Sequence, residues 1–122
     1  MDLYAQNILD HYKHPHNKGE LNKADVSHHE VNDTCGDDIS VSLKMTGNKI
    51  KEIKFDGDGC AISQAGISIL TEALLGKTKS EVLTYEFKNL EKNFGIKISE
   101  RRYKCALLGL WAIQHALEKY KM

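Results

Sequence analysis

The sequence predicts one domain in which a short antiparallel β-hairpin and a weaker third strand are combined with helices. The chain has 122 residues, which is the usual size of a single domain, so we treat residues 1–122 as one unit. Apolar and polar residues alternate over 39–46, Gly47-Asn48 is typical of a two-residue hairpin turn, and 50–55 is the return strand. Apolar residues at helical spacing then predict helices over 60–75 and 99–120.

Local signals define the remaining elements. Residues 2–13 carry an apolar stripe at helical spacing, which includes Tyr12, and the stripe stops before Pro15. The segment 26–34 is a weak strand candidate, because few of its residues are apolar. A capping box at Thr78 predicts a single helix over 79–93. Ser99 is suited to cap the last helix.

Composition excludes several classes of protein. Seventeen basic and 17 acidic residues give a formal net charge of zero, whereas a generic nucleic-acid binder carries a basic excess. No apolar stretch has the length of a membrane span, and residues 1–12 do not resemble a signal peptide. The three cysteines are far apart and odd in number, unlike a secreted disulfide scaffold. We therefore expect a cytoplasmic protein with available thiols and without nucleic-acid or membrane partners.

Cys60 lies in a glycine-rich turn between the return strand and the next helix. Gly57 and Gly59 leave open backbone around it, and a helix N-terminus favours a thiolate. Cys35 and Asp37 precede the first hairpin strand, whose start lies beside the end of the return strand. The hairpin therefore places three candidate ligands at one edge of the sheet.

Cys105 lies in the last predicted helix. Arg101 and Arg102 precede it on one helical face and Lys104 is adjacent, so these cations favour its thiolate, whereas Ser99 is too distant for a helix-start effect. Three thiolates suit zinc, iron or an iron–sulfur cluster. No closely spaced Cys pair of the structural-zinc type is present, so spacing alone also leaves open three unrelated buried cysteines.

The order of several motifs resembles the U-type iron–sulfur cluster assembly scaffold family (IscU, SufU and the NifU N-terminal domain). These motifs cover almost the whole chain: Tyr4…Ile8-Leu9-Asp10-His11-Tyr12…His14-Pro15-His16-Asn17…Gly19, Cys35-Gly36-Asp37, Gly57-Asp58-Gly59-Cys60-Ala61-Ile62-Ser63 and Arg102-Tyr103-Lys104-Cys105-Ala106-Leu107-Leu108. The resemblance implies an α+β fold of the SufE/NifU-like type, with a small antiparallel sheet under packed helices.

The resemblance also implies a metal or cluster site. Its ligands would be Cys35, Asp37, Cys60 and Cys105, holding a 2Fe–2S cluster with zinc as the alternative occupant. A cysteine desulfurase would supply sulfur as a persulfide, for which we choose Cys105 as the acceptor, and apo iron–sulfur proteins would receive the cluster. The hard carboxylate of Asp37 would keep the cluster transferable. Such a scaffold is not an enzyme in the usual sense, and the sequence leaves homo-oligomerisation open.

The chain combines features of two branches of that family. Lys104 stands where Isc-type scaffolds have His, as in the SufU type, and is a candidate hydrogen-bond donor to Asp37 or the cluster. The extra SufU-type segment between the second and third cysteines is absent, as is the Isc-type Leu-Pro-Pro-Val-Lys motif. A cluster scaffold, a zinc-dependent sulfurtransferase and a structural zinc domain therefore remain as alternatives, in that order. We expect His11, His14 and His16 to be ordinary polar residues rather than a second metal site.

Overall fold

A three-stranded antiparallel sheet carries one side of the fold. The structure is a computed structural model that describes residues 3–32, 36–95 and 97–121. The sheet comprises β1 (Val26–Asn32), β2 (Asp37–Thr46) and β3 (Lys49–Asp56), in the order β1-β2-β3. Ser40 pairs with Asp56, so the start of β2 lies beside the end of β3, as the hairpin pattern predicts. The predicted α+β class with a small antiparallel sheet is therefore confirmed.

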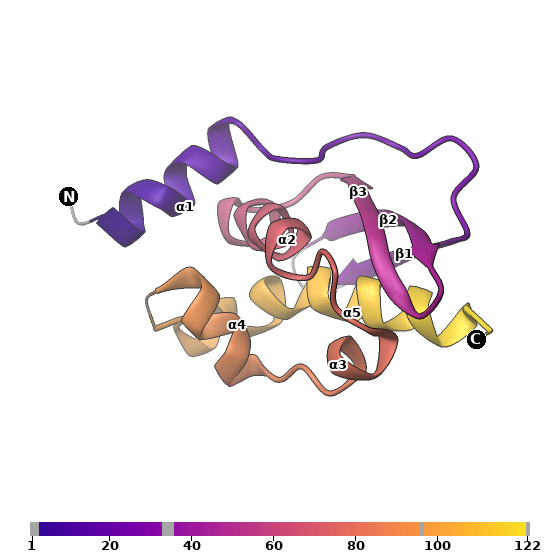
Figure 1. Ribbon diagram of the computed structural model, residues 1–122. Coiled ribbons are helices and arrows are strands. Elements are labelled where there is room, and N and C mark those ends of the chain that lie inside the picture. The colour runs from indigo at the N-terminus through magenta and orange to yellow at the C-terminus, as the bar shows by residue number, and fades with distance from the viewer. Residues whose placement is uncertain (1–2, 33–35, 96, 122) are drawn as a thin grey trace.

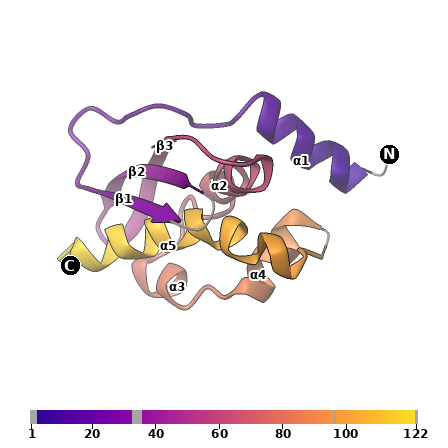
Figure 2. The ribbon, with the colours of Figure 1, turned by 180° about the vertical axis from the view of Figure 1, so that it is seen from behind.

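Helices pack on the sheet and on one another. Their bounds are α1 (Leu3–Lys13), α2 (Ala61–Ala73), α3 (Lys79–Leu83), α4 (Phe87–Phe94) and α5 (Tyr103–Lys119), with a 3-10 turn at Glu100–Arg102. Helix α5 contacts β1 and β2 on one side and α3 and α4 on the other, and lies between them in both ribbon views (Figures 1 and 2). Helix α1 lies at one end of the molecule and packs on α2. Across the described ranges, every helix is too short or too polar to cross a membrane.

The core forms where the apolar face of the sheet meets α2 and α5. Ile39, Val41, Leu43 and Met45 are buried on this face, as their alternation predicts, and share one cluster with residues of both helices. Two helical glycines permit close packing. A Cβ at Gly66 would lie 3.0 Å from Phe94 Cζ, and a Cβ at Gly109 would lie 2.9 Å from Ile67 Cβ. At both positions a side chain of a neighbouring helix occupies the space that a Cβ would take.

The single helix predicted over 79–93 is wrong, because two helices occupy this segment. Thr78 and Glu81 form the predicted capping box, but α3 ends at Leu83 and α4 starts again after Glu86, whose side chain takes part in a second box with Asn89. The Gln114 side chain donates hydrogen bonds to the carbonyls of Val82 (3.0 Å) and Tyr85 (3.1 Å). A side chain from α5 thus satisfies backbone groups at the break, which no local pattern reveals.

The last helix also begins later than predicted. Ser99 starts a 3-10 turn in which Arg102 N–H bonds to Ser99 C=O at 3.0 Å, and the α-helix begins at Tyr103. Cys105 is therefore the third residue of α5. The prediction that Cys105 lies too far from a helix start is wrong, and the helix-start effect does apply to it.

One residue of the apolar stripe predicted for α1 does not pack against the core. Ile8 and His11 are buried, whereas Tyr12 is 44% exposed. Helix α1 packs on α2, and the buried position near its C-terminal end is taken by His11, which hydrogen-bonds Ser68.

Candidate metal centre

Three of the four predicted ligands meet at one point. One ligand atom each from Asp37, Cys60 and Cys105 lies within 4.8 Å of the other two. They come from the first residue of β2, the residue before α2 and the first turn of α5. Cys35, the fourth predicted ligand, lies outside the described residues.

Asp37 is the buried acid of the group. Its side chain is 3% exposed, and Oδ1 accepts a hydrogen bond from the Cys60 backbone N–H at 3.1 Å. Oδ2 is also buried, and among the described residues it has no hydrogen-bond partner. Buried carboxylate oxygens are nearly always paired, so an unpaired one beside two thiols has the arrangement expected of a metal ligand.

The loop before α2 is held against β2 by backbone contacts. Asp38 N–H donates to the Asp58 carbonyl at 2.8 Å. Gly57 has φ +131°, and a Cβ there would lie 2.2 Å from the Asp38 carbonyl oxygen. A Cβ on Gly59 would lie 2.3 Å from Ser63 Oγ and 3.1 Å from Asp37 Cγ. Both glycines are therefore needed for the loop to bring Cys60 to Asp37.

Two helix N-termini converge on the thiols. Cys60 is the N-cap of α2 and makes no side-chain capping hydrogen bond, so its sulfur remains available. Cys105 lies in the first turn of α5. The partial positive charge of each helix start would stabilise a metal-bound thiolate at its cysteine. Cys60 is half-buried, whereas Cys105 is only 1% exposed.

Two of the cationic residues that were predicted to favour a Cys105 thiolate lie at the surface. Arg102 and Lys104 are exposed, and within the described part of the chain Lys104 makes no hydrogen bond to Asp37. A hydrogen bond from Lys104 to Asp37 or to a cluster therefore stays a prediction.

Asn32 is a buried residue near the site that the sequence did not indicate. It pairs with Asp37 in the sheet register, is 8% exposed, and its backbone carbonyl accepts a hydrogen bond from Gly36 N–H at 2.8 Å. Its position three residues before Cys35 carries no recognisable signal.

The donor set suits a soft or borderline cation. Two thiolates and a carboxylate are ligands of zinc and of iron. Zn–S bonds of about 2.3 Å in a tetrahedron separate sulfur ligands by about 3.8 Å. Ligand atoms within 4.8 Å of one another therefore need only a small movement to bind such an ion.

The chain is similar to several known proteins over almost its whole length. The zinc-dependent sulfurtransferase SufU of Bacillus subtilis (strain 168) is 34% identical, with 96% of this chain and 90% of that protein covered. The iron–sulfur cluster assembly scaffold protein IscU of Streptococcus pyogenes serotype M1 is 33% identical, with 96% and 84% covered. The crystal structure of a protein described only as hypothetical superposes with a TM-score of 0.82 at 34% identity, covering 96% of this chain and 98% of that one. The family model described as the NifU-like N terminal domain matches residues 3–122, and the chain therefore belongs to that family.

Proposed function

We propose that the chain is an iron–sulfur cluster assembly scaffold. In this proposal it receives sulfur from a cysteine desulfurase, builds a labile 2Fe–2S cluster on Cys35, Asp37, Cys60 and Cys105, and passes the cluster to apo-proteins. The observation that carries it is the buried Asp37 Oδ2, which lacks a partner among the described residues and lies beside two thiols. Relatives at 30–34% identity that are named IscU and SufU support it.

The ligand set explains how a cluster can be both held and released. Thiolates are soft donors that bind cluster iron firmly, and the two helix N-termini stabilise their charge. Asp37 contributes a hard carboxylate, which is a poorer match for cluster iron. Iron at Asp37 is therefore the point at which a ligand of an acceptor protein enters most easily.

Sulfur reaches the site by exchange rather than by redox chemistry. The Cys105 thiolate attacks the terminal sulfur of the desulfurase persulfide, the S–S bond breaks and the desulfurase thiolate leaves. The product is a Cys105 persulfide, and this transfer needs no external oxidant or reductant. Conversion of the persulfide sulfur to the sulfide of a cluster is a separate step that takes two electrons from an external reductant. Because Cys105 is 1% exposed, this step requires neighbouring residues to move aside when the desulfurase docks.

The release role of Asp37 is tested by cluster transfer. Wild type, Asp37→Ala and Asp38→Ala are loaded anaerobically to equal cluster content, and transfer to one apo-ferredoxin is timed. Asp38 is a matched control, because it is the neighbouring acid and its carboxylate contacts His29 instead of the thiols. We expect Asp37→Ala to hold its cluster longer and transfer it more slowly, and Asp38→Ala to behave as wild type. Transfer from Asp37→Ala at the wild-type rate would refute the release role.

The alternative function is a zinc-dependent sulfurtransferase that relays persulfide sulfur. Its support is the name of the Bacillus subtilis relative and a ligand set that suits zinc. The alignment with that relative extends over 134 residues although this chain has 122, so the relative carries residues that are missing here. Anaerobic purification separates the two functions: iron with acid-labile sulfide and a visible absorption spectrum supports the scaffold, and stoichiometric zinc without sulfide supports the transferase.

A further inference from the structure

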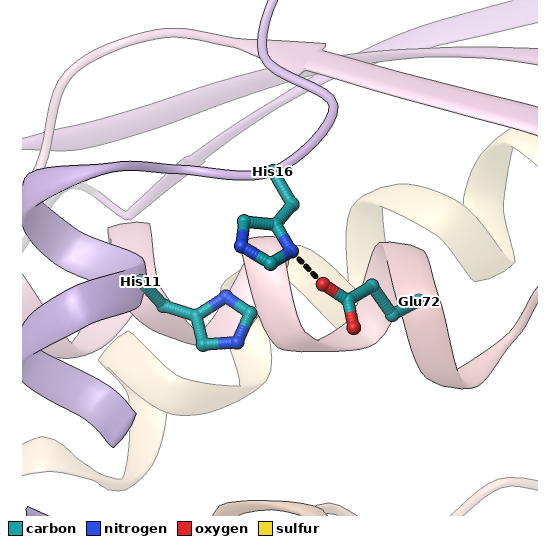
Figure 3. Close-up of side chains that lie close together, drawn as sticks. All are labelled: His11, His16 and Glu72. Atoms are coloured by element: carbon teal, nitrogen blue, oxygen red, sulfur yellow. Dashed lines mark ion pairs between the residues drawn. The ribbon is translucent and has the colours of Figure 1, made fainter. Parts of the chain in front are cut away.

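We propose a second metal site, for a divalent cation of the zinc class, formed by His11, His16 and Glu72 where α1 meets α2. One ligand atom of each residue lies within 4.8 Å of the other two. Figure 3 shows the three side chains turned towards a common space, from α1, from the loop after it and from α2. Two imidazoles and a carboxylate form a known zinc ligand set that leaves a fourth position open.

The two sites are separate. Glu72 lies twelve residues after Cys60, at the other end of α2. At a rise of about 1.5 Å per residue, the two positions are about 18 Å apart along the helix axis. A cation at the second site therefore cannot share ligands with the candidate centre at Asp37, Cys60 and Cys105.

Ser68 orients the buried histidine of the second site. His11 is 6% exposed, and its Nδ1 lies 2.7 Å from Ser68 Oγ, which also accepts a hydrogen bond from the His16 backbone N–H at 2.7 Å. Metal-binding histidines usually hydrogen-bond through the ring nitrogen that does not bind the metal. The serine thus fixes the His11 ring, ties the loop to α2 and leaves Nε2 for a cation.

His16 and Glu72 form the accessible half of the site. His16 Nδ1 contacts Glu72 Oε1, and the two side chains are 52% and 48% exposed. The centroids of the His11 and His16 rings are 4.4 Å apart. Among the described residues, the His11 ring hydrogen-bonds Ser68 and no carboxylate. A cation would draw both imidazoles and the carboxylate onto one centre and could enter from solvent.

A second His–Glu–His group in the molecule has a simpler explanation. Glu30 Oε1 lies 3.1 Å from His28 Nε2 and 2.5 Å from His115 Nδ1. One carboxylate oxygen thus accepts hydrogen bonds from both rings, and these bonds already account for the grouping between β1 and α5. This group is the internal control for the proposed site, because it has the same residue types and we expect it to bind no metal.

A cation bound at the second site would hold α1 against α2, the helix whose N-cap is Cys60. Helix α1 contacts α2 through a short buried face that includes Ile8. Ligands contributed by both helices and by the loop after α1 would make the position of α1 depend on the cation. The second site is therefore a metal-dependent clamp for the N-terminal helix.

The test uses Zn²⁺ and Co²⁺ with the intact chain. Wild type, His16→Gln and Glu72→Gln are compared with two control variants, His14→Gln in the same loop and His115→Gln in the other His–Glu–His group. We expect wild type and both controls to bind one more equivalent of Zn²⁺ than His16→Gln and Glu72→Gln. The two test residues are exposed, so the variants should fold, which circular dichroism checks.

Cobalt spectra separate this result from the proposed function. Co²⁺ at the candidate centre gives thiolate-to-metal charge-transfer absorption, whereas a site with only nitrogen and oxygen ligands does not. We expect His16→Gln to lose only the component without thiolate absorption, and Zn²⁺ to protect α1 amides from hydrogen exchange in wild type but not in that variant. Equal zinc stoichiometry in wild type and His16→Gln would overturn the proposal, as would loss of the second equivalent in His115→Gln alone.

Discussion

Replacing Gly57 by Ala should separate the two halves of the candidate centre. The new Cβ would lie 2.2 Å from the Asp38 carbonyl oxygen, and real Cβ contacts are essentially never under 3.0 Å. Loop and strand must therefore move apart by about 0.8 Å, because the obstacle is backbone rather than a flexible side chain. That movement separates Asp37 on β2 from Cys60 at the end of the loop.

The expected magnitudes follow from these distances. Overpacking costs about 1–3 kcal/mol, and the φ of +131° adds about 1–3 kcal/mol for a residue with a side chain. A domain of 122 residues has a free energy of unfolding of about 6–18 kcal/mol. The variant should therefore still fold, while a ligand displaced by more than about 0.5 Å lowers zinc affinity roughly 10–100-fold.

Gly47→Ala is the matched control for this prediction. Gly47 also has positive φ, +60°, but a Cβ there meets nothing within 4 Å, and it lies at the hairpin turn away from the site. We expect it to lose about 1–2 kcal/mol of stability and to bind zinc as wild type does. Urea unfolding of the metal-free proteins and zinc competition with a chromophoric chelator measure both effects. Wild-type zinc affinity in Gly57→Ala would refute the role assigned to the loop.

Three further predictions concern packing, pH and sulfur transfer. Gly109→Ala should lower the free energy of unfolding by about 1–3 kcal/mol because Ile67 Cα and Cβ block it, whereas Gly66→Ala, which meets mainly the Phe94 ring, should be nearly neutral; urea unfolding compares them. Burial and the nearby His16 lower the pKa of His11 below its ordinary value of 6.5. The free energy of unfolding of metal-free wild type should therefore decrease as the pH falls from 6.5 towards the lowered pKa, and in His11→Gln it should depend less on pH. Cys105→Ser should abolish persulfide acceptance from a desulfurase more completely than Cys35→Ser, as mass spectrometry would show; equal loading of the two variants would contradict the choice of acceptor.

Regular patterns in the sequence predicted most of the fold. Strict alternation over 39–46 and the Gly47-Asn48 turn predicted the hairpin and the face of β2 that meets the core, because a one-residue slip would turn its buried apolar side chains away from the core. β1 gave a weak signal because His28 and Glu30 take inward-facing positions that apolar residues would normally fill. The break between α3 and α4 gave no signal, because it depends on Gln114 from a distant helix.

For the candidate centre, the sequence alone determined the chemistry and part of the geometry. Gly57, Gly59 and the helix pattern after Cys60 identified an accessible thiol at a helix start, because those features are local in the chain. The tertiary structure decided that Cys105 also lies at a helix start and that Asp37 Oδ2 is buried there, with no partner among the described residues. It also brought Glu72 to His11 and His16, which the sequence had led us to expect as ordinary polar residues. Such convergence depends on how helices pack across the core, and a single chain pattern carries no information on which polar faces that packing brings together.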